Sequence, residues 1–128
     1  MRLLLDTNRY RDFCDQDPVA LDRVQTAERL FLSFVTLAEL RAGFLCGTKA
    51  RQNERTLIHF LNSPRVSVLY AGQATVHHYA HLYAQLRRQG TPIPTHDIWI
   101  AALAVEYELV IFSRDQHFDQ LPQIPRLK

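Results

Sequence analysis

The residues in this 128-residue chain with the clearest capacity for chemistry are four carboxylates, each placed where an apolar segment ends or begins. They are Asp6, Glu39, Asp97 and Asp115. Two like charges about 4 Å apart repel by about 4 kcal/mol at an effective dielectric of 20, so a protein gathers such groups only where a cation offsets the repulsion. Mg²⁺ and Mn²⁺ prefer oxygen ligands and keep bound waters, one of which can attack a phosphodiester. If folding brings these acids together, they predict a divalent-metal site for phosphodiester hydrolysis.

The elements that must position these acids are predicted from the apolar pattern, in which short apolar runs alternate with segments of helical spacing. Strands are expected at residues 2–5, 30–35, 66–69 and 109–112, with a short edge strand at 126–128. Helices are expected at 18–30, 37–44, 49–61, 73–89 and 97–106. Alternating strands and helices favour right-handed crossovers. The sequence therefore predicts one α/β domain over residues 1–128, with a mostly parallel sheet of four or five strands flanked by helices.

Parallel strands bring their carboxyl ends to one edge of the sheet, which is where ligands bind in such folds. Asp6, Glu39 and Asp115 follow three of the predicted strands, and Asp97 begins the most apolar helix. Each acid also has a purely structural interpretation. Asp6 can cap a helix, Asp115 can brace a turn or cap a short helix, Thr36 and Glu39 match a capping box, and Asp97 suits the first turn of a helix. Four unrelated caps at one sheet edge is the weaker hypothesis, so a shared metal site is favoured.

Four motifs, which together span almost the whole chain, carry a resemblance to a known family. They are Leu3-Leu4-Leu5-Asp6-Thr7-Asn8, Thr36-Leu37-Ala38-Glu39-Leu40, Thr95-His96-Asp97-Ile98-Trp99-Ile100-Ala101-Ala102 and Ser113-Arg114-Asp115-x-His117-Phe118. In this order and spacing they resemble the PIN-domain nucleases, specifically the VapC-type toxins of toxin–antitoxin pairs. The resemblance implies a PIN-like fold and a metal-dependent endoribonuclease that leaves a 5′-phosphate and a 3′-hydroxyl. It also implies inhibition by a small VapB-type antitoxin and a homodimeric assembly.

The same resemblance implies a role for each acid. Asp6 and Asp97 correspond to direct metal ligands, Glu39 to a ligand or a holder of water, and Asp115 to the fourth acid. The implied cofactor is Mg²⁺ or Mn²⁺, and the implied substrate is RNA. No nucleophile from the protein is needed, because the attacking group is a metal-activated water.

Two further positions correspond to residues that support the acids by hydrogen bonds in the family, namely Asn8 and Ser113. One position departs from the family pattern, since His96 stands where relatives often carry Asn. This departure bears on substrate preference more than on catalysis.

Candidate substrate contacts are basic side chains near the acidic motifs. The chain has 15 Lys and Arg residues against 13 Asp and Glu, and this net charge of +2 does not by itself require a polyanionic partner. Arginine nevertheless suits bidentate phosphate contacts. Arg9, Arg11 and Arg114 follow acidic positions and are candidate phosphate contacts, with a solvated surface role as the alternative. His117 is a candidate substrate contact, with a packing or surface role as the alternative.

The composition places the protein among ordinary globular chains. With 47% apolar and 22% charged residues it fits neither a disordered nor a fibrous protein. The longest apolar stretch, 98–105, is far shorter than the roughly 18 to 20 residues of a membrane span. There is no apolar run of signal-peptide length, and Cys14 and Cys46 occur singly. We therefore expect a cytoplasmic protein with no membrane association and no disulfide.

Three alternatives remain open from the residues. A phosphoacceptor receiver domain also gathers acids at strand ends, but it needs an acid after its third strand and a lysine after its last, and neither is present here. A catalytically inactive PIN-like module that only binds RNA or protein is a second alternative, against which the presence of all four acids argues. A zinc site is a third, because His77 and His81 have a suitable spacing, but no Cys or Glu of a helical zinc motif accompanies them.

Overall fold

The computed structural model describes all residues from Met1 to Lys128, and its centre is a five-stranded sheet in which every strand pair is parallel. The strands are β1 (Arg2–Leu5), β2 (Arg29–Ser33), β3 (Val66–Leu69), β4 (Val110–Phe112) and β5 (Arg126–Leu127). Their order across the sheet is β3-β2-β1-β4-β5. The predicted α/β class and parallel sheet are confirmed, with five strands.

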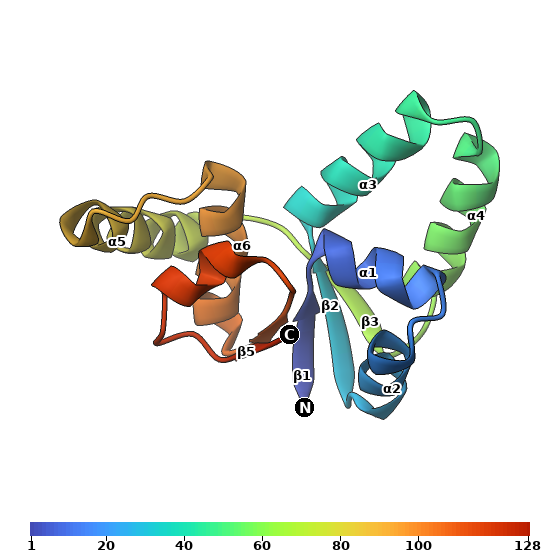
Figure 1. Ribbon diagram of the computed structural model, residues 1–128, viewed down its shortest axis with the longest axis horizontal. Coiled ribbons are helices and arrows are strands. Elements are labelled where there is room, and N and C mark those ends of the chain that lie inside the picture. Colours follow the sequence, from blue (N-terminus) through green and yellow to red (C-terminus); the bar gives the residue numbers. More distant parts are fainter.

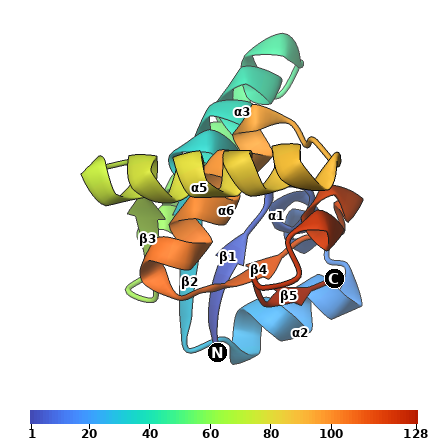
Figure 2. The ribbon, with the colours of Figure 1, turned by 90° about the vertical axis from the view of Figure 1, so that its left-hand side faces the viewer.

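Helices cover both faces of the sheet. They are α1 (Thr7–Cys14), α2 (Pro18–Thr26), α3 (Phe34–Cys46), α4 (Ala50–Leu61), α5 (Gln73–Gln89), α6 (Thr95–Tyr107) and the short 3-10 helix η1 (Gln116–Gln120). Figure 1 shows α1 to α4 on one side of the strands, with α5 and α6 on the other. Figure 2 shows α5 lying across α6 on that second side. The central strands β2, β1 and β4 are therefore largely buried between two helical layers.

Two hydrophobic cores result, one on each face of the sheet, because side chains of a strand point alternately to opposite faces. In β1, Leu4 packs in the core under α5 and α6, whereas Leu3 and Leu5 pack in the core under α1 to α4. Ile111 and Phe112 of β4 divide between the cores in the same way. Such double burial explains why these strands are continuous apolar runs without polar alternation.

The boundaries of two predicted elements were wrong at the ends of β2. The predicted strand 30–35 ends at Ser33, because the Ser33 hydroxyl accepts a hydrogen bond from the Thr36 backbone N–H at 3.0 Å and so caps α3. The alternative of a capping box between Thr36 and Glu39 is wrong for the same reason. The predicted helix 18–30 ends at Thr26, since the chain becomes extended at Ala27 before β2.

None of the helices has the length and the apolar character of a membrane-spanning segment. Both cysteines, Cys14 and Cys46, are exposed and free.

Candidate active site

The strand order reverses at β1. The chain runs from β1 outward to β2 and β3 on one side, and then returns to β4 on the opposite side of β1. Open α/β sheets bind ligands beyond the carboxyl ends of the strands at such a reversal, because the connecting chains diverge there. Asp6 immediately follows β1 and Ser113 immediately follows β4, and the Ser113 hydroxyl donates a hydrogen bond to Asp6 Oδ2 at 2.7 Å. The two strand ends therefore meet through side chains at the reversal.

Asp6 lies at this reversal of strand order and is only 5% exposed. Its Oδ1 caps α1 by accepting the Thr7 backbone N–H at 2.8 Å, and the Asn8 amide lies 3.4 Å from Oδ2. Burial raises the pKa of Asp6, the hydrogen bond from Ser113 opposes this change, and the charges of Glu39 and Asp115 add to it. Asp6 therefore both caps α1 and lies near other acids.

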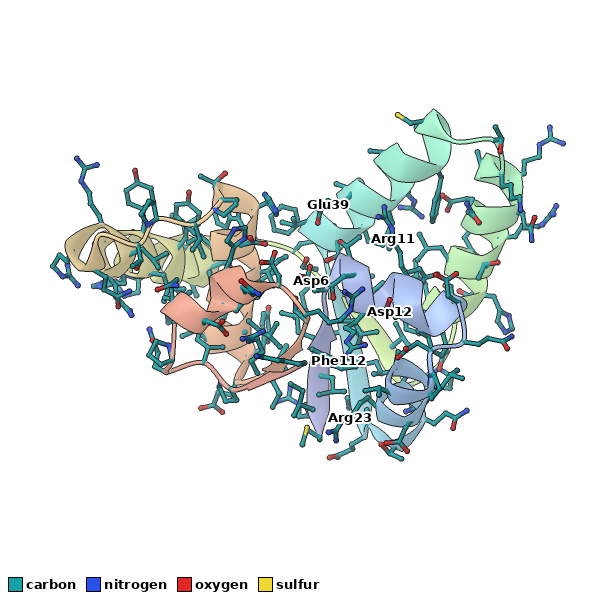
Figure 3. All side chains as sticks on the ribbon, in the orientation of Figure 1. Asp6, Arg11, Asp12, Arg23, Glu39 and Phe112 are labelled. Atoms are coloured by element: carbon teal, nitrogen blue, oxygen red, sulfur yellow. The ribbon has the colours of Figure 1, made fainter.

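Glu39, on α3, is the second acid of the group. Its Oε1 accepts a hydrogen bond from the Thr7 hydroxyl at 2.9 Å, which ties the first turn of α1 to α3. Figure 3 shows Asp6 and Glu39 close to the same junction of β1, α1 and α3. The sequence gives no sign of this contact, because a hydrogen bond between residues 7 and 39 leaves no local pattern.

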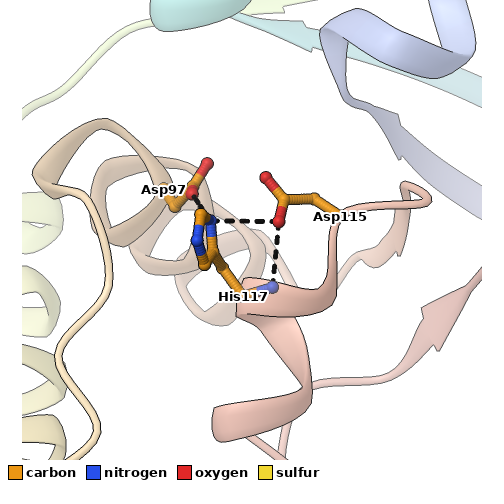
Figure 4. A group of neighbouring side chains, drawn as sticks. All are labelled: Asp97, Asp115 and His117. Atoms are coloured by element: carbon orange, nitrogen blue, oxygen red, sulfur yellow. Dashed lines mark hydrogen bonds and ion pairs between the residues drawn. The ribbon is translucent and has the colours of Figure 1, made fainter.

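The other two acids of the group, Asp97 and Asp115, come from α6 and from the residue that precedes η1. Asp97, in the first turn of α6, is 1% exposed, and Asp115 caps η1 by accepting the His117 backbone N–H at 2.9 Å. The His117 ring lies against both acids, with Nδ1 2.8 Å from Asp97 Oδ2 and 3.0 Å from Asp115 Oδ1 (Figure 4). One potential ligand atom from each of these three residues lies within 4.8 Å of the other two.

The pKa of Asp97 responds both to Asp115, beside it, and to Asp6, at the end of β1. Burial is the main cause that raises its pKa to about 6, and the charges of Asp115 and Asp6 raise it further. A nearby charge on His96 and the hydrogen bond with His117 act in the opposite direction. The charges of Glu39 and Asp115 likewise raise the pKa of Asp6, so each of the two buried aspartates is affected by other acids of the group.

This donor set fits a hard divalent cation. No Lys or Arg forms an ion pair with any of the four acids, and the only basic side chains paired with them are the imidazoles of His96 and His117. Buried carboxylates without a permanent cation are costly, and carboxylate oxygens are the ligands that Mg²⁺ and Mn²⁺ prefer. The arrangement can therefore hold a cation and, with it, a phosphate group.

Two of the arginines predicted near the site are engaged within the protein. Arg9 is buried, pairs with Asp12 at 3.1 Å and Asp17 at 3.5 Å, and lies over the Phe112 ring. The Arg114 guanidinium forms two hydrogen bonds to Asp12, at 2.8 and 3.0 Å, although its side chain is half exposed. Burial leaves Arg9 no surface for a phosphate, whereas Arg114 would have to exchange Asp12 for one.

Arg11 differs, because it is exposed and lines a cavity of about 430 Å³ formed by α1, α3 and α4. Its guanidinium passes over Gly43, where an added Cβ would lie 3.1 Å from Nη2. Tyr10, Leu40 and Phe44 supply apolar parts of the wall. Figure 3 shows Arg11 between α1 and α3, on the same side of the sheet as Glu39.

Comparison with known proteins gives a consistent result. The family model described as "PIN domain" matches residues 3–124. Ribonuclease VapC1 of Haemophilus influenzae (strain R2866) is 32% identical over 90% of this chain and 87% of its own. Plasmid stability protein StbB of Pseudomonas syringae pv. tomato is 36% identical over 88% of this chain and 87% of its own. The crystal structure of VapBC-1 from nontypeable H. influenzae has a TM-score of 0.86 at 27% identity, covering 100% of this chain and 98% of that one.

Proposed function

The chain belongs to the PIN-domain family, and from this premise we propose that it is a metal-dependent endoribonuclease, the toxin of a toxin–antitoxin pair. The observation that carries the proposal is the cluster of four acids at the reversal of strand order, unpaired with any Lys or Arg. The names of its relatives, ribonuclease VapC1 among them, supply the substrate class.

In this proposal Asp6 and Asp97 hold Mg²⁺ or Mn²⁺, with Glu39 and Asp115 completing the oxygen ligands or orienting water. The bound cation lowers the pKa of a coordinated water and offsets the charge of the phosphate. Burial contributes by excluding bulk water from Asp6 and Asp97, which strengthens their attraction for a cation.

The neighbouring polar residues fix the geometry of the acids. Ser113 donates to Asp6 and accepts from the Asp115 backbone N–H at 3.0 Å, so one hydroxyl sets the relative position of two acids. Asn8 donates to the Ser113 hydroxyl at 3.2 Å and accepts the Arg114 backbone N–H at 3.1 Å, which joins α1 to the segment after β4. Such outer contacts typically contribute about 10- to 100-fold in metal affinity or activity. Asn8 and Ser113 are therefore positioning residues.

RNA and a VapB-type antitoxin are the proposed partners, as the VapBC complexes among the structural relatives suggest. The cavity between α1, α3 and α4, with Arg11 on its wall, is the proposed seat of an antitoxin segment or of RNA. We also propose a homodimer, for which the exposed Val76 and Tyr83 of α5 supply an apolar surface. The two free cysteines favour a reducing, cytoplasmic location.

A cleavage assay tests the enzyme directly. The purified chain, first stripped with a chelator, should cut RNA only after Mg²⁺ or Mn²⁺ is added, and the new 5′ ends should carry phosphate. Asp6→Asn should lower the rate by at least about a hundredfold, because it removes a ligand and its charge. Asp22→Asn, an exposed aspartate on α2, is the control and should cut at the wild-type rate. RNA binding with no metal-dependent cleavage would assign the chain to the inactive PIN-like modules instead.

A further inference from the structure

We infer that His117 is a ligand of the proposed cation through Nδ1, and that this nitrogen makes the site prefer Mn²⁺ to Mg²⁺. The inference rests on the proposed function only in requiring a cation at the acids. It does not depend on which RNA is cut, nor on cleavage itself.

The spacing of the three atoms carries the inference. His117 Nδ1 lies 2.8 Å from Asp97 Oδ2 and 3.0 Å from Asp115 Oδ1. These are hydrogen-bond separations in the metal-free protein. Adjacent ligands of an octahedral ion with bonds of about 2.1 Å also lie about 3 Å apart, so the same three atoms can become neighbouring ligands of one ion once Nδ1 has lost its proton. Figure 4 shows the ring edge facing both carboxylates across a short gap.

The backbone, rather than packing of the ring, places this imidazole. The His117 N–H is held by Asp115 Oδ1, and the Arg126 guanidinium donates to the Asp115 carbonyl at 3.1 Å. The next residue, Phe118, is buried and anchors η1 in the core. The His117 side chain itself stays 47% exposed, so its substitution leaves the core intact.

A second imidazole provides the matched comparison. His96 Nε2 lies 3.4 Å from Asp97 Oδ1, the other oxygen of the same carboxylate, and the His96 side chain is 49% exposed. Its only acidic contact is Asp97, whereas His117 contacts two acids. The two histidines thus share exposure and a common partner, but only His117 has the position of a ligand.

The chemistry of the donor set then predicts selectivity. Mg²⁺ takes oxygen ligands almost exclusively, whereas first-row transition ions also accept imidazole nitrogen, Mn²⁺ the most weakly among them but better than Mg²⁺ does. Carboxylates and water alone would bind both ions in similar ways. One nitrogen among these oxygens should therefore favour Mn²⁺.

The test measures binding of Mn²⁺ and of Mg²⁺ to the full chain by calorimetry, together with electron spin-echo spectroscopy of bound Mn²⁺. In the wild type we expect tighter binding of Mn²⁺ and a ¹⁴N coupling from a directly bound imidazole. His117→Ala should weaken Mn²⁺ binding by about tenfold or more, change Mg²⁺ binding by much less, and abolish the coupling. His117→Asn, which offers an amide oxygen, should shift the preference toward Mg²⁺ and also abolish the coupling. His96→Ala should keep both the coupling and the preference.

Three results would overturn the inference. One is a ¹⁴N coupling that survives in His117→Ala. Another is equal loss of binding for both ions in that variant. The third is tighter binding of both ions, which would show that the imidazole only competes with the cation for the acids. Thermal unfolding of each variant checks that it is folded. A chain that binds Mn²⁺ through His117 but cuts no RNA would contradict the proposed function and leave this inference standing.

Discussion

At the scale of single residues, the site places charge where the protein would otherwise avoid it. Asp97 is almost completely buried, and this burial raises its pKa to about 6. Its ionised form at neutral pH therefore opposes folding unless a cation is bound. Binding of the proposed cation would therefore stabilise the protein, because the metal-free fold holds this buried charge at a cost in free energy.

Asp97→Asn should remove this cost. The pKa of Asp97 is about 6 in the folded protein and 3.8 ordinarily, so the folded state holds this proton more tightly than the unfolded state. The contribution of Asp97 to stability is therefore greatest at low pH and is lost between about pH 4 and pH 6. The loss is up to about 3 kcal/mol. In a chelator at pH 7, the variant should be more stable than the wild type, and the difference should shrink at pH 4.5. Urea unfolding at both pH values measures it. An equal difference at both values would contradict the pKa argument.

Ser113→Ala tests the positioning role of a buried hydroxyl. The substitution removes a donor to Asp6 and leaves the Asp115 backbone N–H without its acceptor, so it should cost about 1 to 3 kcal/mol of unfolding free energy. It should also weaken metal binding by about 10- to 100-fold. Ser67→Ala is the control, because the Ser67 hydroxyl in β3 accepts a hydrogen bond from the Arg29 guanidinium and bonds to none of the four acids. This variant should bind metal normally. Unchanged metal affinity in Ser113→Ala would show that the hydroxyl serves stability alone.

The positions of the four acids in the fold follow from the sequence, whereas most of their contacts do not. The acids were predictable because each borders an apolar run, and Asn8 and Ser113 because they stand in family motifs. The contact of Thr7 with Glu39 and the burial of Arg9 depend on how α1 packs on α3 and β4, which no local pattern encodes.

At the scale of elements, β1 and α1 position Asp6 and Asn8, since Asp6 joins the two elements and Asn8 lies in the first turn of α1. The apolar periodicity predicted the strands and most helices, but it gave no bounds for α1. This helix is short, and its buried face includes Arg9, a charged residue that a periodicity analysis assigns to solvent. Pairing with Asp12 and Asp17 and contact with the Phe112 ring make that burial possible.

Arg9→Ala should therefore act on stability. It removes the cation of Asp17 and one of the two cations of Asp12, which keeps Arg114, and it removes the contact with Phe112, so we expect a loss of about 1 to 3 kcal/mol in chemical unfolding. The cleavage rate per folded molecule, measured at low temperature, should change little.

Arg11→Ala, two residues further along α1 at an exposed position, should alter stability by less than about 0.5 kcal/mol. It should weaken RNA binding and reduce its salt dependence by about one charge. The opposite pattern, with RNA binding lost in Arg9→Ala without loss of stability, would return Arg9 to the substrate site.

At the scale of the whole molecule, strand order converts scattered residues into one site. The alternation of strands and helices predicted parallel pairing, but the order β3-β2-β1-β4-β5 is set by the direction of each crossover, which the strands themselves do not specify. That order brings the ends of β1 and β4 together, and α6 and η1 then contribute Asp97 and Asp115 from the other helical layer. Much of the site could be predicted residue by residue, whereas its geometry required the fold.

Anomalous X-ray scattering from crystals of the wild-type protein grown with Mn²⁺ would show whether the acids at the reversal of strand order bind a cation. We predict one strong manganese peak beyond the carboxyl ends of β1 and β4, with oxygens of Asp6 and Asp97 at about 2.1 to 2.3 Å from it. Manganese bound only away from the carboxyl ends of β1 and β4 would contradict a metal site at these acids. So would side chains of Arg or Lys that lie between the acids.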